Sequence, residues 1–166
     1  MSLRRLHYDS VWNALDILRD RWTFLVLRET FFGVRRFDQF QRNLGIARNI
    51  LTDRLRRLEA QGMLERRLST PFEYRLTPKG RDIYPIFLAM LHWGDTWTAR
   101  PEGPPLLLFH KLCDHQMTPL VTCDHCGKEV DSHDVWYEDN PAVPDVPSLD
   151  ISEQISISKS DELSHE

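Results

Sequence analysis

The apolar positions of the first hundred residues recur at helical spacing. The segments 11–18 and 22–32 both follow this pattern, and the second is apolar on nearly every side, as in a helix buried inside a bundle. Two further helical patterns, 37–44 and 47–61, are separated by Gly45, which favours a tight turn between them. The hydrophobic pattern therefore predicts an N-terminal domain that is mainly α-helical.

Each of the last two patterns has one apolar face. The face of the third predicted helix consists of Phe37, Phe40 and Leu44, with Gln41 beside them. The face of the fourth consists of Ala47, Leu51, Leu55 and Leu58. We expect both faces to pack into one core, and Gly62 to end the fourth helix.

A short hairpin and a long helix are predicted next. Apolar residues on either side of Ser69-Thr70-Pro71 indicate two short strands around a turn at those residues, within 63–76. Thr77-Pro78 is a helix-start signal, and the helix is expected to continue to about Trp97 with a kink at Pro85. Its apolar residues lie on too many sides of the helix for one small core to bury them all, so part of them is expected to contact a second copy of the chain.

The remainder of the chain changes character at residue 99. The sequence ARPEGPP at 99–105 has the composition of a linker, and all three cysteines lie in a module at 106–138. Residues 139–166 are rich in proline, serine and acids and are expected to form a disordered acidic tail. The predicted fold is thus a mainly α winged domain at 1–98, with a small β module after the linker.

Charge divides the chain at the same place. Residues 1–100 contain 18 Lys and Arg against 11 Asp and Glu, whereas residues 101–166 contain 3 against 14. A basic half favours a polyanionic partner, and an acidic half favours a module that does not touch one. Solvated surface would also account for both, so the asymmetry alone does not decide. No stretch is apolar enough to span a membrane or to act as a signal peptide, which predicts a cytoplasmic protein without a membrane partner.

The order helix, helix, tight turn, helix, hairpin is typical of a winged helix-turn-helix, whose recognition helix enters the major groove of double-stranded DNA. With Leu51 at the centre of the buried face, the opposite face consists of Asn49, Thr52, Asp53 and Arg56, with Arg48 and Arg57 at its margins. Arg, Asn and Thr can read base edges, while Asp53 can accept from cytosine or orient Arg56. The expected phosphate contacts are Arg35, Arg36, Arg66 and Arg67.

The alternative for these residues is an ordinary charged helix face. Between 35 and 57, however, there are seven arginines, no lysine and only two acids. The rigid guanidinium fork is better suited to phosphates and bases than to solubility alone. We therefore favour DNA binding for this segment.

The motifs RWT, G-x-RRF, GI, LT-x-RL-x-x-L and EYRLT-x-KG, together with WGD, resemble the HxlR family of bacterial winged-helix transcriptional regulators over residues 9–98. The resemblance implies a homodimer built by the terminal helices, a nearly palindromic operator, and activation or repression of nearby genes. The chain departs from the family at three places. Asp9 stands where many members carry a sensor cysteine, Ala47 where a serine often caps the recognition helix, and the wing is short.

The cysteine module predicts a metal site. His110, Cys113, Cys123 and Cys126 form an H-x2-C pair and a C-x2-C pair, which suit tetrahedral Zn²⁺ in a structural zinc-ribbon-like site. His115 is the alternative fourth ligand. Cysteines packed as small hydrophobes, or a redox-active Cys123–Cys126 pair, are competing interpretations. The odd number of cysteines argues against a disulfide framework.

The sequence as a whole favours a homodimeric, sequence-specific DNA-binding transcriptional regulator that is not an enzyme. A metal- or redox-responsive sensor built on the cysteine module, and a winged helix that binds an acidic protein, are the alternatives. A zinc hydrolase is the weakest of the alternatives, because four protein ligands leave no position for a reactive water. A small-molecule effector of unknown identity is kept as a candidate partner.

Overall fold

The computed structural model describes residues 10–68, 72–98 and 101–138. Its helices are α1 (Ser10–Leu18), α2 (Arg21–Phe31), α3 (Phe37–Leu44), α4 (Arg48–Ala60), α5 (Pro78–Asp82) and α6 (Tyr84–Thr98). Its strands are β1 (Leu64–Arg67), β2 (Glu73–Leu76), β3 (Phe109–His110) and β4 (His115–Gln116). The position of Asp9, the predicted turn at Ser69–Pro71 and the predicted acidic tail all lie outside the described residues.

The core lies where α2, α3 and α4 meet the base of the hairpin. It consists of Val26, Leu27, Phe40, Ile46, Leu51, Leu55, Leu58, Met63 and Leu64. The prediction for Leu51, Leu55 and Leu58 is confirmed, since each is at most 1% exposed. The prediction for Ala47 is wrong. Ala47 is exposed because it is the N-cap of α4, with extended backbone, and precedes the first helical residue.

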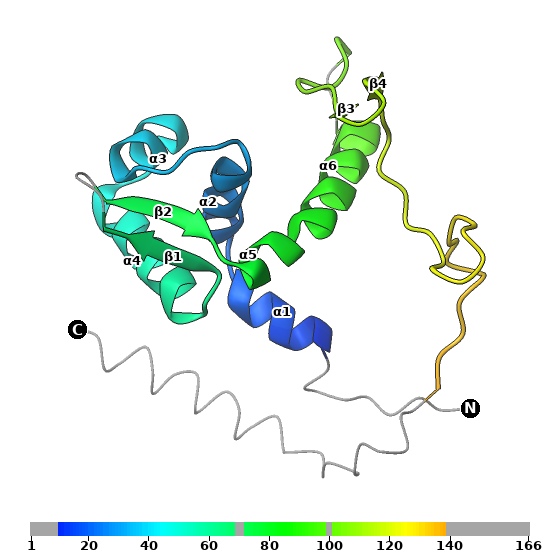
Figure 1. The fold of residues 1–166 in the computed structure, drawn as a ribbon, viewed down its shortest axis with the longest axis horizontal. Coiled ribbons are helices and arrows are strands. Elements are labelled where there is room, and N and C mark those ends of the chain that lie inside the picture. Colours follow the sequence, from blue (N-terminus) through cyan, green and yellow to red (C-terminus); the bar gives the residue numbers. More distant parts are fainter. Residues whose placement is uncertain (1–9, 69–71, 99–100, 139–166) are drawn as a thin grey trace.

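The wing is an antiparallel hairpin. Strands β1 and β2 pair with Leu64 opposite Leu76 and Arg67 opposite Glu73. The N–H of Tyr74 donates to the carbonyl of Arg35 over 2.8 Å, which ties β2 to the loop before α3. The hairpin is thereby fixed beside the helix-turn-helix formed by α3 and α4 (Figure 1).

The long helix predicted after Thr77 is two helices. Helix α5 ends at Asp82, and α6 begins at Tyr84 after the single turn residue Ile83. Proline lacks the N–H that would bond to the fourth residue before it, and its ring clashes with that carbonyl. Pro85 therefore interrupts the helix and does not merely kink it. The start signal at Thr77 is confirmed, because its hydroxyl accepts the N–H of Gly80 over 3.1 Å.

Residues 101–138, which we call the arm, extend away from the winged domain (Figure 1). The arm contains the β3–β4 hairpin and a second hairpin closed by the Thr122–Glu129 pair. No residue in the arm is buried. It therefore has no apolar core of its own.

Candidate nucleic-acid interface

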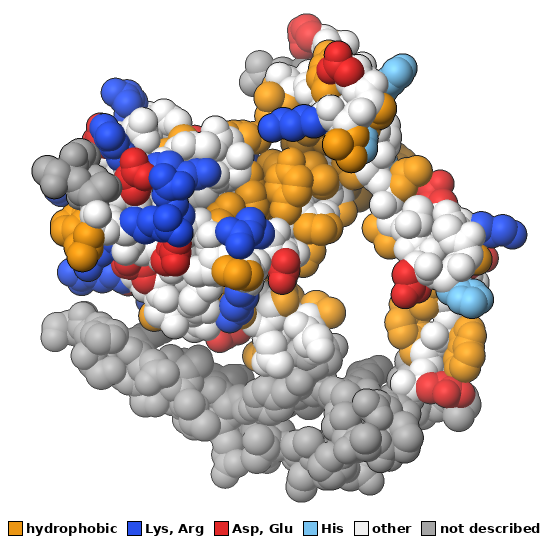
Figure 2. All heavy atoms as spheres, viewed as in Figure 1, with side chains coloured by type: hydrophobic (Ala, Val, Ile, Leu, Met, Phe, Trp, Pro, Cys, Tyr) orange, Lys and Arg blue, Asp and Glu red, His pale blue; other side chains and the backbone are white. Residues whose placement is uncertain are grey.

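The exposed side of α4 brings five of the predicted base-reading residues together. One surface hollow is lined by Arg48, Asn49, Thr52, Asp53 and Arg56. The hollow lies on the opposite side of α4 from the buried leucine face, as the helical spacing predicts. Most of the Lys and Arg side chains visible in Figure 2 gather over the winged domain, and few lie over the arm.

The arginines of α4 differ in how much of their hydrogen-bonding capacity the protein itself uses. Arg57 Nε lies 3.1 Å from Asp53 Oδ2, and the guanidinium of Arg54 pairs with the same carboxylate. Asp53 thus holds Arg54 and Arg57, whereas one of the two roles suggested by the sequence was to orient Arg56. Arg56 is exposed and has no ion pair or hydrogen bond with the described residues. Its guanidinium is available to an external acceptor.

Two other side chains of the hollow are set by local contacts. The guanidinium of Arg48 stacks over the ring of Phe37 with 4.9 Å between its central carbon and the ring centroid. This contact comes from α3 and orients Arg48 across the helix-turn-helix. The hydroxyl of Thr52 donates to the carbonyl of Arg48 over 2.8 Å, which leaves its oxygen as an acceptor and its methyl group as an apolar contact.

Helix α4 is anchored to α2 by Asp20, which is not among the site residues predicted from the sequence. Asp20 Oδ1 accepts the N–H groups of Trp22 and Thr23, and Oδ2 lies 2.8 Å from Arg54 Nε. Burial raises the pKa of Asp20, but the hydrogen bonds from Thr23, Arg54 and Trp22 outweigh burial and hold this pKa below its usual value. The Asp20 carboxylate is therefore ionised, and in this form it caps α2 and positions α4. The position of Asp20 directly before the RWT motif is a sequence signal for an N-cap. Its ion pair with Arg54 on α4 has no such signal in the sequence.

The predicted phosphate contacts are not equivalent. Arg35 Nη1 donates to the carbonyls of Thr30 and Val34 over 2.6 and 2.8 Å, so this arginine closes the loop after α2. Arg36 is exposed, and its backbone N–H is capped by the side-chain oxygen of Gln39 over 3.1 Å. Arg36 is accordingly better placed than Arg35 to reach an external anion.

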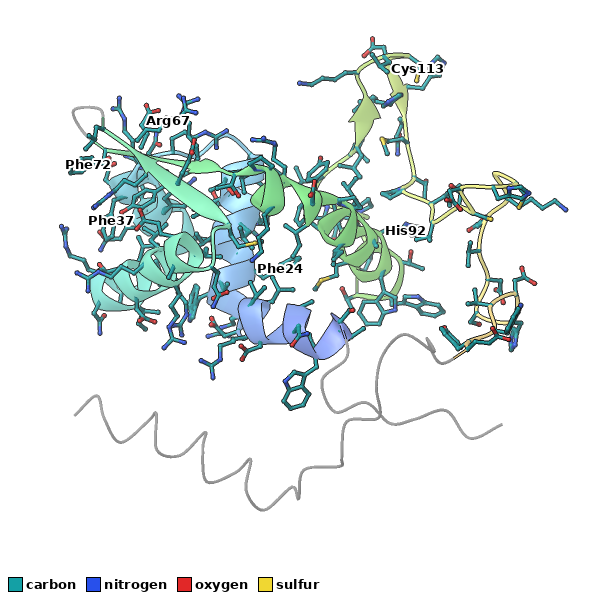
Figure 3. All side chains as sticks on the ribbon, turned by 60° about the horizontal axis from the view of Figure 1, so that its bottom comes forward. Phe24, Phe37, Arg67, Phe72, His92 and Cys113 are labelled. Carbon is teal, nitrogen blue, oxygen red and sulfur yellow. The ribbon has the colours of Figure 1, made fainter. Side chains whose placement is uncertain are left out.

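The wing carries the other two candidates. Arg66 stacks over Phe72 at 4.9 Å, and its Nε lies 3.7 Å from a carboxylate oxygen of Glu59. Arg67 Nε lies 2.9 Å from Glu65 Oε1, and the side chain remains largely exposed. Arg67 and Phe72 both lie at the end of the hairpin, on the far side of the protein from Cys113 (Figure 3).

The start of α4 has no side-chain cap. Ala47 provides no side-chain hydrogen bond, as expected from the missing serine, and the first helical bond runs from Leu51 N to Ala47 O. The N–H groups of the first turn, at Arg48, Asn49 and Ile50, thus face outward without an intrahelical acceptor. Such a turn carries partial positive charge at the edge of the hollow.

The predicted metal ligands come together in pairs only. His110 Nδ1 lies 3.4 Å from Cys113 Sγ. The thiol of Cys123 accepts hydrogen bonds from the backbone N–H of Cys126, the backbone N–H of His125 and the thiol of Cys126, and these lower its pKa. Within the described residues no three His, Cys, Asp or Glu side chains form a group that could hold a metal ion, and all three cysteines are free thiols.

The alternative ligand has a different contact. His115 Nδ1 lies 2.6 Å from the backbone carbonyl of Cys113, so that nitrogen is already engaged. His110, by contrast, has its ring against the Cys113 sulfur. The local geometry favours His110 as the partner of Cys113.

Comparisons with known proteins agree with this arrangement. The family model for HxlR-like helix-turn-helix proteins matches residues 17–102. Rv3095 of Mycobacterium tuberculosis, named as an HTH-type transcriptional regulator, is 45% identical over 144 residues that cover 82% of this chain and 89% of the relative. The described helices include none that is both long enough and apolar enough to cross a membrane.

Two solved structures are also similar. PA1607, described as a candidate transcription factor, aligns over 82% of this chain and 98% of its own, with 29% identity and a TM-score of 0.74. The redox regulator HypR in its oxidized form covers 55% of this chain, with 33% identity and a TM-score of 0.50. A match over 82% of the chain is longer than residues 1–102, so the similarity to PA1607 reaches into the arm. The chain belongs to the HxlR-like helix-turn-helix family and is a winged-helix transcriptional regulator.

Proposed function

We propose that the protein acts as a homodimer that reads a pseudo-palindromic DNA operator through α4. The observation that carries this proposal is the hollow on α4, where five polar side chains converge on the face opposite the core. An α-helix fits the major groove of B-DNA, and these side chains would then meet the base edges. The hairpin β1–β2 would lie along the backbone beside it.

The side chains of the hollow suggest how bases are read. Arg56, which has no ion pair within the described residues, is suited to a bidentate contact with guanine O6 and N7. Asn49 is suited to adenine, and the methyl group of Thr52 to thymine. Arg57 is held by Asp53 and is suited to a backbone phosphate at the margin.

Phosphate contacts would fix the helix in the groove. Arg36, Arg66 and Arg67 are exposed around α4 and the wing, and the uncapped N–H groups at the start of α4 are a further anion site. Arg35 is tied to backbone carbonyls, so we assign it a structural role within the same loop. Binding through these contacts should weaken steeply as salt concentration rises.

Helix α6 supports the dimer. Ile86, Met90, Trp93 and Trp97 are spaced by four, three and four residues along one side of α6, and they are 46, 53, 62 and 74% exposed. This is the spacing of an apolar stripe that packs against another helix. Val11 and Leu15 of α1 are 64 and 60% exposed as well. A surface this apolar on a water-exposed helix favours burial against a second copy of the chain.

The test is selection of bound duplexes from a random-sequence DNA library, with light scattering of the protein alone and on a selected duplex. We expect two inverted half-sites whose centres lie about one helical turn apart, roughly 10 base pairs or a multiple of this, and two chains per duplex. Recovery of unrelated sequences at moderate salt would contradict sequence-specific binding. Recovery of no duplex at all at moderate salt would favour the alternative in which the basic face binds an acidic protein.

A second candidate function is control of DNA binding by the oxidation state of the arm. The pair of half-buried Cys123 and exposed Cys126 favours it, because hydrogen bonds to the Cys123 sulfur lower its pKa and promote the reactive thiolate. HypR, a redox regulator in its oxidized form, is similar over part of this chain. Under this function, mild oxidant would change operator affinity in the full chain and leave it unchanged in Cys123→Ser.

A further inference from the structure

The arm contains two turns of the same backbone design. In the first turn, the N–H of Asp114 donates to the carbonyl of His110 over 2.8 Å, and in the second, Gly127 donates to Cys123 over 2.8 Å. Asp114 and Gly127 both adopt left-handed backbone, with φ of 56° and 71°. Left-handed backbone is uncommon for residues other than glycine, so the first turn keeps this shape despite its cost.

The strands that flank the two turns are joined by equivalent contacts. These are the Cα pairs Phe109–Gln116 and Thr122–Glu129, and the 2.9 Å hydrogen bonds from Met117 N to Leu108 O and from Val130 N to Val121 O. Each of these contacts in the first hairpin is repeated in the second hairpin at the same offset along the chain. The arm is therefore a duplicated hairpin, and each copy places two metal-ligating side chains at the same two positions of its turn.

The side chains of the first copy already have the spacing of zinc ligands. Two ligands at tetrahedral angles, with Zn–N near 2.0–2.1 Å and Zn–S near 2.3 Å, lie about 3.5 Å apart. His110 Nδ1 and Cys113 Sγ are 3.4 Å apart. In the second copy, the backbone N–H groups of Cys126 and His125 point at the Cys123 sulfur and fix its position in the turn. Each pair therefore offers two nitrogen or sulfur ligands to a soft divalent cation.

The arm has no apolar core that would stabilise its two hairpins. None of its residues is buried, and its apolar side chains lie open to solvent, with Leu112 90% and Trp136 73% exposed. A segment this short without an apolar core usually requires a metal, a disulfide or association with another chain. The arm's cysteines are free, which leaves a metal and association with another chain.

Within one chain, however, the two pairs stand apart. No group of three or more potential ligands forms in the described residues, and the connecting residues 117–121 contain no turn or bend. Figure 1 shows the β3–β4 hairpin near the end of α6 and the second hairpin well separated from it along the arm. Each chain thus offers two half-sites, and a closed structural zinc site takes four ligands.

We propose that zinc is bound between the two chains of the dimer. Each ion is held by His110 and Cys113 of one chain together with the second turn, Cys123-x2-Cys126, of the partner subunit. Two-fold symmetry pairs the remaining two turns in the same way, which gives two identical sites per dimer. The partner's arm would also cover apolar residues such as Val121, which is 64% exposed in the single chain. This inference rests on the homodimer of the proposed function.

The experiment uses the full chain, purified without added metal, with zinc measured by mass spectrometry and assembly by light scattering. We expect about one zinc per chain in the wild-type dimer, and loss of zinc in Cys113→Ser and in Cys126→Ser. His125→Ala is the matched control, because it changes the second turn without removing a ligand, and it should keep its zinc. Helical circular dichroism, which reports on the separately packed winged domain, confirms that each variant is folded.

The decisive sample is a mixed dimer of Cys113→Ser and Cys126→Ser chains, co-expressed with two different affinity tags. Shared sites predict one zinc per mixed dimer, because the intact first turn of one chain meets the intact second turn of the other. A mixed dimer without zinc, beside a wild-type protein with one zinc per chain, would place each site within a single chain and overturn the shared arrangement. Wild-type protein without zinc would overturn the site itself, and a monomeric wild-type chain would refute the dimer.

Discussion

Gly80 is the residue where the structure makes its sharpest prediction for a single methyl group. A Cβ built at this position lies 2.0 Å from the carbonyl oxygen of Met63 and 3.1 Å from Leu76 Cδ2. A carbon and a carbonyl oxygen normally stay roughly 3.3 Å apart. Gly80→Ala must therefore push α5 and the start of β1 apart by more than ~1 Å.

The cost of this movement can be assembled from the contacts. The same Met63 carbonyl accepts the N–H of Thr77 over 3.1 Å, so displacement weakens a hydrogen bond worth about 1 kcal/mol. Overpacking at a rigid contact adds about 1–3 kcal/mol. Alanine returns up to about 1 kcal/mol because it is the better helix former. We expect Gly80→Ala to lower the free energy of unfolding by about 1–3 kcal/mol.

The assay is urea denaturation followed by helical circular dichroism, with Gly94→Ala as the matched control. Within the chain, an added methyl at Gly94 in α6 meets only Thr98 Oγ1 at 3.8 Å, so this variant should be neutral or gain up to about 1 kcal/mol. Unchanged or increased stability in Gly80→Ala would show that α5 does not pack against Met63 as described.

Three further outcomes follow from the site. Asp20→Ala should lower stability by about 2 kcal/mol at pH 7, because it removes the cap of α2 and the partner of Arg54. The pKa of Asp20 in the folded protein lies below its unfolded value near 3.9, so this contribution is present above about pH 4 and is lost as pH falls through the folded pKa. An equal difference between the urea midpoints of wild type and Asp20→Ala at pH 7 and at pH 2 would refute it. Arg67→Ala should weaken all duplexes alike and reduce the salt slope by about 1, measured by fluorescence anisotropy. Trp93→Asp should shift the dimer towards monomer in light scattering, whereas an unchanged dimer would exclude α6 from the interface.

Helical spacing was sufficient to predict much of the winged domain. The row formed by Leu51, Leu55 and Leu58 is buried, and the polar residues opposite it share one hollow. This works because a regular helix converts sequence spacing directly into a face. The break between α5 and α6 was underestimated, because the pattern of apolar residues continues across Pro85 although the backbone hydrogen bonds do not.

Pairing between side chains was much harder to predict. The sequence predicts that Asp53 contacts a base or Arg56, and in the structure it pairs with Arg54 and Arg57. The roles of Asp20 and Arg35 depend on contacts between segments distant in sequence or on loop geometry, which periodicity does not encode. In the arm, the ligand spacing was visible in the sequence, but the equivalence of the two turns required backbone geometry.

The most direct test of the central claim is the base preference of Arg56→Ala beside wild-type protein. An operator obtained by selection would be varied at every position, and affinities measured at one fixed salt concentration. The account predicts that the variant loses about 1–3 kcal/mol of discrimination at one base pair in each half-site and keeps its preferences elsewhere. An unchanged preference at every position would contradict the assignment of α4 as the helix that reads DNA.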